Sequence, residues 1–303
     1  MRSCTILSSL DAALALGAAA IPHKLAEDQL RYVAAQQLPD GGYRGRRGDS
    51  DTYYTDFAVR ILSLIAGGTS ASSTAGYLQQ LPKPTDVVDC FNRLNIARLL
   101  GTDVLRMETG LPAIRSVLRR SRLPNGAYAR QGCDQASAYN TFLGLLCMEM
   151  LDEDAEDACA AIAELRRADG GYGDTPGDTA GQTNPTAAAL LVQMASDRAD
   201  APAIRFLASM QAPDGGFRAH ADAPCGDLLS TFSVLTALIL ADRLDEIDLP
   251  AAARFIQRMK VPGGGFRSCA ADPDPDIEYT WYGIGSVAIL GAHVAQRRSK
   301  EYI

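Results

Sequence analysis

This sequence of 303 residues has little basic charge and only three histidines. It holds 29 Lys and Arg against 36 Asp and Glu, a formal net charge of −7, and it has no basic stripe, so we expect no nucleic acid partner. The seven cysteines are odd in number and include no Cys-x-x-Cys pair. This usage is typical of reduced thiols and argues against a disulfide framework, which predicts a cytoplasmic protein.

Long apolar runs are also absent. No stretch reaches the roughly 18 uninterrupted apolar residues that a membrane helix needs, so we expect no membrane span. The first twenty residues are largely apolar, but Asp11 interrupts them. That interruption favours a first outer helix over residues 5–20, packed on the ring of the remaining chain, rather than a signal peptide. With 47% hydrophobic residues the chain can build a large core, and we expect a single domain over residues 1–303.

What the sequence has in quantity is a recurring Gly-Gly-aromatic motif. Counted from the first glycine of each motif, the copies begin at residues 41, 126, 170, 215 and 264, and the last three intervals are 44, 45 and 49 residues. The copies are Asp40-Gly41-Gly42-Tyr43, the weaker Asn125-Gly126-Ala127-Tyr128, Asp169-Gly170-Gly171-Tyr172, Asp214-Gly215-Gly216-Phe217 and Gly263-Gly264-Gly265-Phe266. A fixed period of this length indicates a repeat architecture.

Each copy lies between two runs with helical spacing. The run 203–211, before Asp214, is amphipathic, and the glycines that follow can end such a helix because they accept left-handed backbone. After a polar loop comes an Asp, which can cap the next helix. That second helix is apolar on most faces, so we expect it to be the buried one.

Six such helix pairs fit the chain, because the interval from 41 to 126 spans about two periods and predicts a degenerate copy near residue 83. The repeats are expected at about 28–66, 67–101, 112–151, 155–196, 201–243 and 249–293. Their second helices are expected to start near Asp51, Asp86, Asp134, Gln182, Asp227 and Asp276. Stacked pairs bury each other's apolar faces, and six of them can close into a ring with the second helices inside.

Each repeat thus consists of a helix, a Gly-Gly-aromatic turn, a loop, an Asp and a second helix. Such repeats resemble those of protein prenyltransferase β subunits, especially the Rab geranylgeranyltransferase type. They are also similar to the repeats of squalene and terpene cyclases. The resemblance covers roughly residues 28–293. It implies an all-α fold, an α6–α6 toroid, with an apolar central funnel for a small hydrophobic isoprenoid-like substrate. An α-type subunit or a peptide is a further partner that the resemblance leaves open.

The zinc ligands of the resembling prenyltransferases are largely missing. The resemblance places an Asp-x-Cys at the fifth inner helix, where Asp227 matches but Leu229 replaces the Cys. It places a His at the sixth, where this chain has Tyr279. A rebuilt site from Cys225, Asp227 and Cys269 is an alternative, but structural zinc usually takes four ligands. We therefore expect no metal ion, zinc included, and no other cofactor.

The diphosphate-binding residues that the resemblance implies are also weakened. In residues 134–139, at the expected start of the third inner helix, Ala136 replaces the Arg that the resemblance implies. The fourth inner helix has no basic residue at its start. Phosphate recognition depends on charge-assisted donors, so this loss matters. The remaining candidates are loop residues, namely Arg44, Arg46, Arg47 and Arg218. Mg²⁺ is expected only if a diphosphate is bound.

The sixth inner helix begins with a run that resembles the Asp-x-Asp-Asp-Thr motif of class II terpene cyclases. Asp276 and Thr280 match, and Glu278 takes the place of the middle Asp, the general acid of that motif. A carboxyl in an apolar funnel has a raised pKa and can stay protonated. Glu278 and Asp276 are thus the candidate catalytic residues. Aromatic faces stabilise cations, and the candidate substrate-binding residues are Tyr53, Tyr54, Tyr139, Tyr279, Trp281 and Tyr282, with Asp227.

Architecture offers another explanation for the same acids. Asp recurs at the start of five second helices, as expected of N-caps, and a first-turn Glu also stabilises a helix dipole. Three functions stay open. The preferred one is protonation-initiated, class II-like cyclisation of an isoprenoid-like substrate. The others are prenyl transfer from a diphosphate by a prenyltransferase β-like subunit, and non-catalytic binding of a lipid or peptide.

Overall fold

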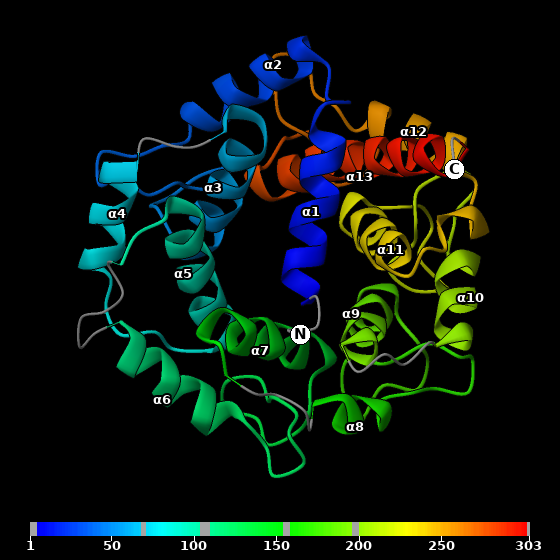
Figure 1. Cartoon of the computed structure of the whole chain (residues 1–303), viewed down its shortest axis with the longest axis horizontal. Coiled ribbons are helices and arrows are strands. Elements are labelled where there is room, and N and C mark those ends of the chain that lie inside the picture. Colours follow the sequence, from blue (N-terminus) through cyan, green and yellow to red (C-terminus); the bar gives the residue numbers. More distant parts are fainter. Residues whose placement is uncertain (1–4, 68–70, 104–109, 154–157, 196–199, 302–303) are drawn as a thin grey trace.

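The computed structural model describes residues 5–67, 71–103, 110–153, 158–195 and 200–301. Over these residues the regular structure is helical, and β-type pairing is confined to isolated bridges. Inner and outer helices alternate along the chain after a first helix, α1 (Ile6–Ala18) (Figure 1). Of the helices described, none combines the length and the apolarity needed to cross a membrane.

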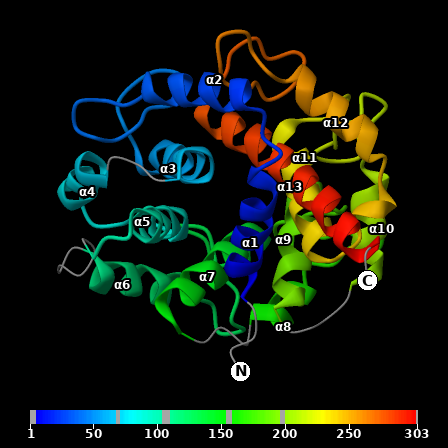
Figure 2. The same cartoon turned by 45° about the horizontal axis from the view of Figure 1, so that its top comes forward.

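The inner helices form the barrel. They are α3 (Thr52–Ala66), α5 (Val87–Leu100), α7 (Ala138–Leu151), α9 (Thr183–Met194), α11 (Leu228–Leu240) and α13 (Ile277–Glu301). The outer helices are α2 (His23–Ala34), α4 (Ala71–Gln80), α6 (Leu111–Ser121), α8 (Ala158–Ala163), α10 (Ala201–Ser209) and α12 (Leu249–Arg258), and a 3-10 turn, η2 (Leu244–Glu246), joins α11 to α12. Each inner helix packs on the next, and α13 returns to α3, which closes the ring (Figures 1 and 2). The predicted α6–α6 toroid is confirmed.

The closure joins parts of the chain that are far apart in sequence. The side-chain oxygen of Gln29, on α2, accepts a hydrogen bond from the Gly265 N–H at 2.7 Å, and both groups are buried. Between the inner helices of the first and last repeats, the rings of Phe57 and Tyr282 meet edge to face with centroids 5.4 Å apart. We call this junction of the first and last repeats the seam.

The Gly-Gly-aromatic turns have a structural explanation at each position. The first glycine has positive φ, as in Gly215 at 89°. The second glycine lies under an aromatic ring of the next outer helix, so that a Cβ at Gly216 would come within 2.7 Å of the Phe255 ring. The turn therefore both ends one outer helix and packs against the following one.

The aromatic residue of each turn is tied to its inner helix by a threonine. In five repeats the aromatic N–H donates to a threonine hydroxyl, in the pairs Tyr43–Thr55, Tyr128–Thr141, Tyr172–Thr186, Phe217–Thr231 and Phe266–Thr280. Thr280, which matched the cyclase motif, thus has the same architectural role as four other threonines.

Three of the six predicted helix starts carry the expected caps. The carboxylates of Asp51, Asp86 and Asp227 accept hydrogen bonds from the N–H groups three residues later. The prediction for Asp134 is wrong, because Ser137 caps α7 and Asp134 lies in an exposed loop. The hydroxyl of Ser137 donates to the carboxylate of Asp174, so the next repeat already supplies a carboxylate at this helix start.

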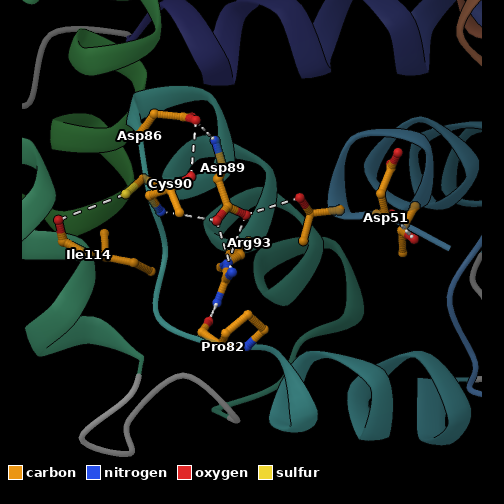
Figure 3. Close-up of polar contacts among 10 residues, drawn as sticks. Asp51, Pro82, Asp86, Asp89, Cys90, Arg93 and Ile114 are labelled. Carbon is orange, nitrogen blue, oxygen red and sulfur yellow. Dashed lines mark hydrogen bonds and ion pairs between the residues drawn. The ribbon is translucent and has the colours of Figure 1, made fainter. Parts of the chain in front are cut away.

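The degenerate second repeat replaces the glycine turn by side-chain contacts (Figure 3). The guanidinium of Arg93, on α5, donates to the Pro82 carbonyl at 2.6 Å and pairs with the Asp89 carboxylate at 2.8 Å. Asp89 also accepts from the Thr52 hydroxyl of the neighbouring inner helix at 3.0 Å. These bonds fix the link between α4 and α5 without a Gly-Gly motif.

Helix α1 lies in a different place from the predicted outer position. It forms within residues 5–20, as expected, but it crosses the end of the barrel where the inner helices finish (Figure 1). The carboxylate of Glu149, near the end of α7, accepts from the N–H groups of Ile6 and Leu7, each at 3.1 Å. Asp11 pairs with Arg98 in the last turn of α5. The first helix therefore closes the carboxyl-terminal end of the barrel.

Candidate functional site

One position of the inner helices faces the barrel axis at the end opposite α1. It is the second residue after each helix cap, and in all six repeats it keeps accessible surface, whereas the residue before it is buried in five. We call these six residues the mouth ring. They are Tyr53, Val88, Tyr139, Asn184, Leu229 and Glu278. The mouth ring surrounds the amino-terminal ends of the inner helices.

Tyr139 shows that the axis is accessible there. The residue is 43% exposed, although it lies on an inner helix. Surrounding protein nevertheless desolvates its phenol and raises the pKa of Tyr139 to about 12, with opposing influences from the charges of Arg60 and Glu278. Those two groups belong to α3 and α13, across the ring from α7. Tyr139 therefore faces an interior space that it shares with both.

Glu278 is the acid of the mouth ring. Its Oε1 accepts hydrogen bonds from the hydroxyls of Tyr53 at 2.8 Å and Tyr282 at 3.2 Å. No described group bonds to Oε2, and this atom keeps accessible surface. Burial raises the pKa of the Glu278 carboxyl, the tyrosine hydrogen bonds act in the opposite direction, and the nearby Asp276 charge adds to the rise.

Asp276 lies beside Glu278 and plays two structural parts. Its Oδ1 accepts from the Glu278 N–H at 2.8 Å, and its Oδ2 lies 3.5 Å from Nε of Arg46. Arg46 also pairs with Asp272, so this loop arginine from the first repeat holds the acidic loop of the sixth. The pKa of Asp276 is raised by burial, and Arg46 opposes that rise. Tyr54 stands beside the same acids, which add to the effect of burial and raise its pKa to about 12.

An aromatic layer lies below the mouth ring. Tyr282 packs against Phe232 with centroids 5.3 Å apart and against Tyr279 at 6.0 Å, and Tyr53 packs on Phe57 at 4.9 Å. Trp281, 4% exposed, meets Phe232 at 5.9 Å. The layer thus combines side chains of α3, α11 and α13.

A guanidinium that the sequence interpretation missed occupies part of this layer. Arg60 on α3 places its central carbon 5.1 Å from the ring centres of both Phe57 and Phe91, and 5.7 Å from that of Trp281. It pairs with the fully buried Asp56 one turn earlier. The signal was present in the sequence as an Asp and an Arg four residues apart in an otherwise apolar inner helix.

The residues at the expected zinc position do not fit a zinc ion. The Asp227 carboxylate is engaged at its own helix start, where it accepts from the Ser230 N–H at 2.7 Å and from the Ser230 hydroxyl at 2.8 Å. The thiols of Cys225 and Cys269 lie together, but with the engaged Asp227 they would make three ligands, and structural zinc usually takes four. Over the described residues, no three or more His, Cys, Asp or Glu side chains are grouped as metal ligands.

Most of the predicted site residues therefore share one region. Glu278, Asp276, Tyr53, Tyr54, Tyr279 and Tyr282 adjoin the seam, and Tyr139 faces them across the axis. Trp281 lies deeper, against Arg60, and Asp227 influences Tyr279 from the neighbouring helix. Asn184 is a mouth-ring residue that the sequence interpretation missed. Its carbonyl oxygen is buried without a partner among the described residues, and alignment of the helix caps would have found it.

Comparison with known proteins agrees with this architecture. Drimenyl diphosphate synthase of Streptomyces showdoensis is 27% identical over 246 residues, which cover 72% of this chain and 46% of that protein, so the chain spans about half of that relative's length. A chain of Candida albicans protein geranylgeranyltransferase-I, solved in complex with GGPP, superposes with a TM-score of 0.70 at 14% identity over 88% of this chain and 91% of that one. The type II terpene cyclase MstE from Scytonema gives 0.62 at 15% identity over 90% and 98%.

The family model described as the prenyltransferase alpha-alpha toroid domain matches residues 2–199 and 186–303. Between them these two matches cover almost the whole chain, in agreement with the closed ring of six helix pairs. The chain therefore belongs to the prenyltransferase alpha-alpha toroid family.

Proposed function

We propose that this protein cyclises an isoprenoid-like polyene by protonation, with Glu278 as the general acid. The observation that carries the proposal is the environment of Glu278. Two tyrosine hydroxyls hold Oε1, Oε2 is free and accessible at the axis, and burial raises the pKa of the carboxyl. A raised pKa favours the protonated carboxylic acid that such chemistry requires.

The proposed reaction begins when the proton on Oε2 moves to one carbon of an alkene. The alkene's π electrons form the new C–H bond and leave a carbocation, which a second alkene of the chain attacks to close a ring. Loss of a proton to water restores a neutral product, and the Glu278 carboxylate takes up a proton from solvent. Tyr53 and Tyr282 hold the carboxylate in place and stabilise its charged form after the transfer.

The aromatic layer supports the same proposal. Carbocations are stabilised by aromatic faces, and the rings of Tyr53 and Tyr282 lie beside Glu278, with Phe232 packed on Tyr282. Trp281 already faces the Arg60 guanidinium, so the proposal places the cation beside the tyrosines and Phe232. The relatives add support at the level of substrate class, since they include a drimenyl diphosphate synthase and a type II terpene cyclase.

The decisive experiment supplies the pure protein with squalene, prenyl diphosphates and related polyenes and detects products by mass spectrometry. Glu278→Gln keeps the shape of the side chain and removes the acidic proton, so turnover should fall by about 10²-fold or more. Glu27→Gln, on the exposed surface of α2, is the matched control and should leave turnover unchanged. Unchanged turnover in Glu278→Gln, with binding intact, would contradict the assignment.

A second measurement separates this proposal from protein prenylation. Prenyl transfer to a cysteine thiol yields a prenylated peptide and depends on zinc in the resembling enzymes, whereas protonation gives a cyclic product without a thiol acceptor. Leu229 and Tyr279 stand where the resembling enzymes have zinc ligands, which favours the cyclic product over the prenylated peptide. A zinc-dependent prenylated peptide would replace the proposal. Binding of polyenes without any product would indicate a non-catalytic toroid.

A further inference from the structure

A second ring of axis-facing residues lies below the mouth ring. Seven residues make about two turns of helix, so the residue seven positions after each mouth-ring residue lies on the same face of its helix. The residues there are Arg60, Asn95, Leu146, Leu191, Thr236 and Gly285, which we call the floor ring. Seven residues of helix place it about 10 Å deeper than the mouth ring. Three of its members are polar, although the level lies inside the barrel and above α1.

The guanidinium of Arg60 points toward the axis. Helices α5 and α13 flank α3 on its two sides, and Arg60 lies within 5.1 Å of the Phe91 ring from one and 5.7 Å of the Trp281 ring from the other. Its charge also acts on Tyr139, which faces the accessible space from the opposite side of the barrel. Arg60 also lies two helical turns after Tyr53, so it shares the inner face of α3 with that mouth-ring residue.

Arg60 has hydrogen-bond donors to spare. Its Nη2 pairs with Asp56, whose other oxygen accepts from the Asn95 amide at 2.6 Å. Among the described residues, no acceptor bonds to Nη1, which keeps accessible surface in a side chain that is 19% exposed. Nε of Arg60 and Nε1 of Trp281 are buried, likewise without a partner in the described structure. Buried donors without acceptors are rare in folded proteins, and each needs an explanation.

These donors determine which chemical group of a ligand can bind at the floor ring. A hydrocarbon end pressed against Arg60 would displace water from Nη1 and return no hydrogen bond, which lowers affinity. An oxygen acceptor would restore the bond. Asp56 already balances the charge of Arg60, so an anionic group would bury an uncompensated charge. An uncharged oxygen therefore fits the site best.

We propose that Arg60 is the anchor of a binding subsite at the barrel floor, which takes an uncharged oxygen atom of the ligand, as in an alcohol, a ketone or an ether. The inference rests on the proposed isoprenoid-like ligand and adds its polarity and orientation. The oxygenated end of the ligand lies at Arg60, and the alkene to be protonated lies nearer the mouth, at Glu278.

The chain's single tryptophan provides the readout, because Trp281 lies beside Arg60. Farnesol and farnesene share a carbon chain and differ by the hydroxyl, and each is titrated against the full chain while tryptophan fluorescence is recorded. Farnesol should bind about tenfold or more tightly than farnesene, the scale of one hydrogen bond to a charged donor. Equal affinities, or no fluorescence change with either probe, would overturn the proposal.

The matched variant is the double substitution Asp56→Asn with Arg60→Met, which removes both charges and so leaves no unpaired ion. It should bind the two probes equally, whereas Arg254→Met, on the exposed surface of α12, should keep the preference. A preference retained in a folded double variant contradicts the inference. If the double variant does not fold, Arg60→Lys decides, because a single ammonium on a differently shaped side chain should reduce the preference for farnesol and an unchanged preference overturns the role of Arg60.

This measurement needs no turnover, so it separates the floor subsite from the proposed reaction. An inactive protein that prefers farnesol through Arg60 would refute cyclisation and leave the subsite standing. An active cyclase without the preference would refute the subsite alone.

Discussion

Among the acids at the inner-helix starts, Glu278 is distinguished by its place in the first turn. Asp51, Asp86 and Asp227 stand at the caps, where their carboxylates bond to backbone N–H groups. Glu278 comes two residues later, at the position that faces the axis, and its partners are the phenols of Tyr53 and Tyr282. A shift of two residues thus separates an architectural carboxylate from one that can meet a ligand.

The raised pKa of Glu278 predicts how stability depends on pH. Below the ordinary value of 4.5 the carboxyl is protonated in the folded and the unfolded chain, so it does not affect the free energy of unfolding. As pH rises above 4.5 the unfolded chain loses this proton first, and the folded state becomes relatively less stable until pH passes the raised pKa. Glu278→Gln, which cannot ionise, should therefore gain stability relative to the wild type as pH rises above 4.5 towards the raised pKa.

Urea unfolding at several pH values measures this difference. Glu27→Gln, whose side chain is exposed, should parallel the wild type throughout. A constant difference between Glu278→Gln and the wild type across the pH range would show that the folded protein does not perturb this carboxyl.

The sequence was sufficient to single out Glu278 but not its surroundings. Glu278 was recognisable because no other repeat has an acid at that offset. Its bond to Tyr53 joins residues 225 positions apart, and it depends on how the first and last repeats meet. Arg60 was overlooked because an Asp and an Arg four residues apart also fit an ordinary helix-surface pair, and only the ring places them inside.

At the scale of elements, the turns were predicted well because their chemistry is local. Glycine at positive φ ends a helix wherever it occurs, and the period of the copies gave the number of helix pairs. The start of α7 was misplaced because the cap, Ser137, is fixed by Asp174 of the next repeat. The position of α1 could not be predicted from the sequence either, because its contacts with Glu149 and Arg98 join residues that are far apart in the chain.

The second glycine of the turn gives a test at this scale. In Gly216→Ala the new Cβ would lie 2.7 Å from the ring of Phe255 on α12, so the turn and the next outer helix would have to separate. We expect a loss of about 1–3 kcal/mol in the free energy of unfolding, as for other overpacked sites. Chemical denaturation followed by circular dichroism measures it.

Gly76→Ala is the matched control. Gly76 lies within α4, and a Cβ there meets no atom within 4 Å. Alanine favours helix over glycine by up to about 1 kcal/mol, so this variant should be as stable as the wild type or more so. A Gly216→Ala protein as stable as Gly76→Ala would mean that the turn does not depend on this contact.

At the scale of the whole molecule, the seam makes the repeats a ring. Gln29 of the first repeat accepts a hydrogen bond from the Gly265 N–H of the last repeat. Arg46 of the first repeat forms ion pairs with Asp272 and Asp276 of the last. In an open solenoid the two terminal repeats would each leave one face uncovered. Here the terminal repeats cover each other.

Gln29→Leu tests the seam. It removes the acceptor of the Gly265 N–H and leaves that donor buried, which should lower the free energy of unfolding by about 1–3 kcal/mol. Gln79→Leu, on the exposed surface of α4, is the matched substitution and should change stability little. Urea denaturation of both variants gives the comparison, and equal stabilities would show that the seam does not depend on this bond.

The seam also determines when, during synthesis and folding, the residues of the candidate site come together. Glu278 bonds to Tyr53 across 225 residues of chain, so this bond forms only after both ends of the ring have been synthesised. Contacts of such separation are slow to form, because a long loop must close before they are made. In a truncated chain whose first and last repeats do not meet, we expect Glu278 to lack Tyr53 and part of the burial that raises its pKa. We therefore expect the raised pKa of Glu278, and any acid catalysis that depends on it, only in chains that close the ring.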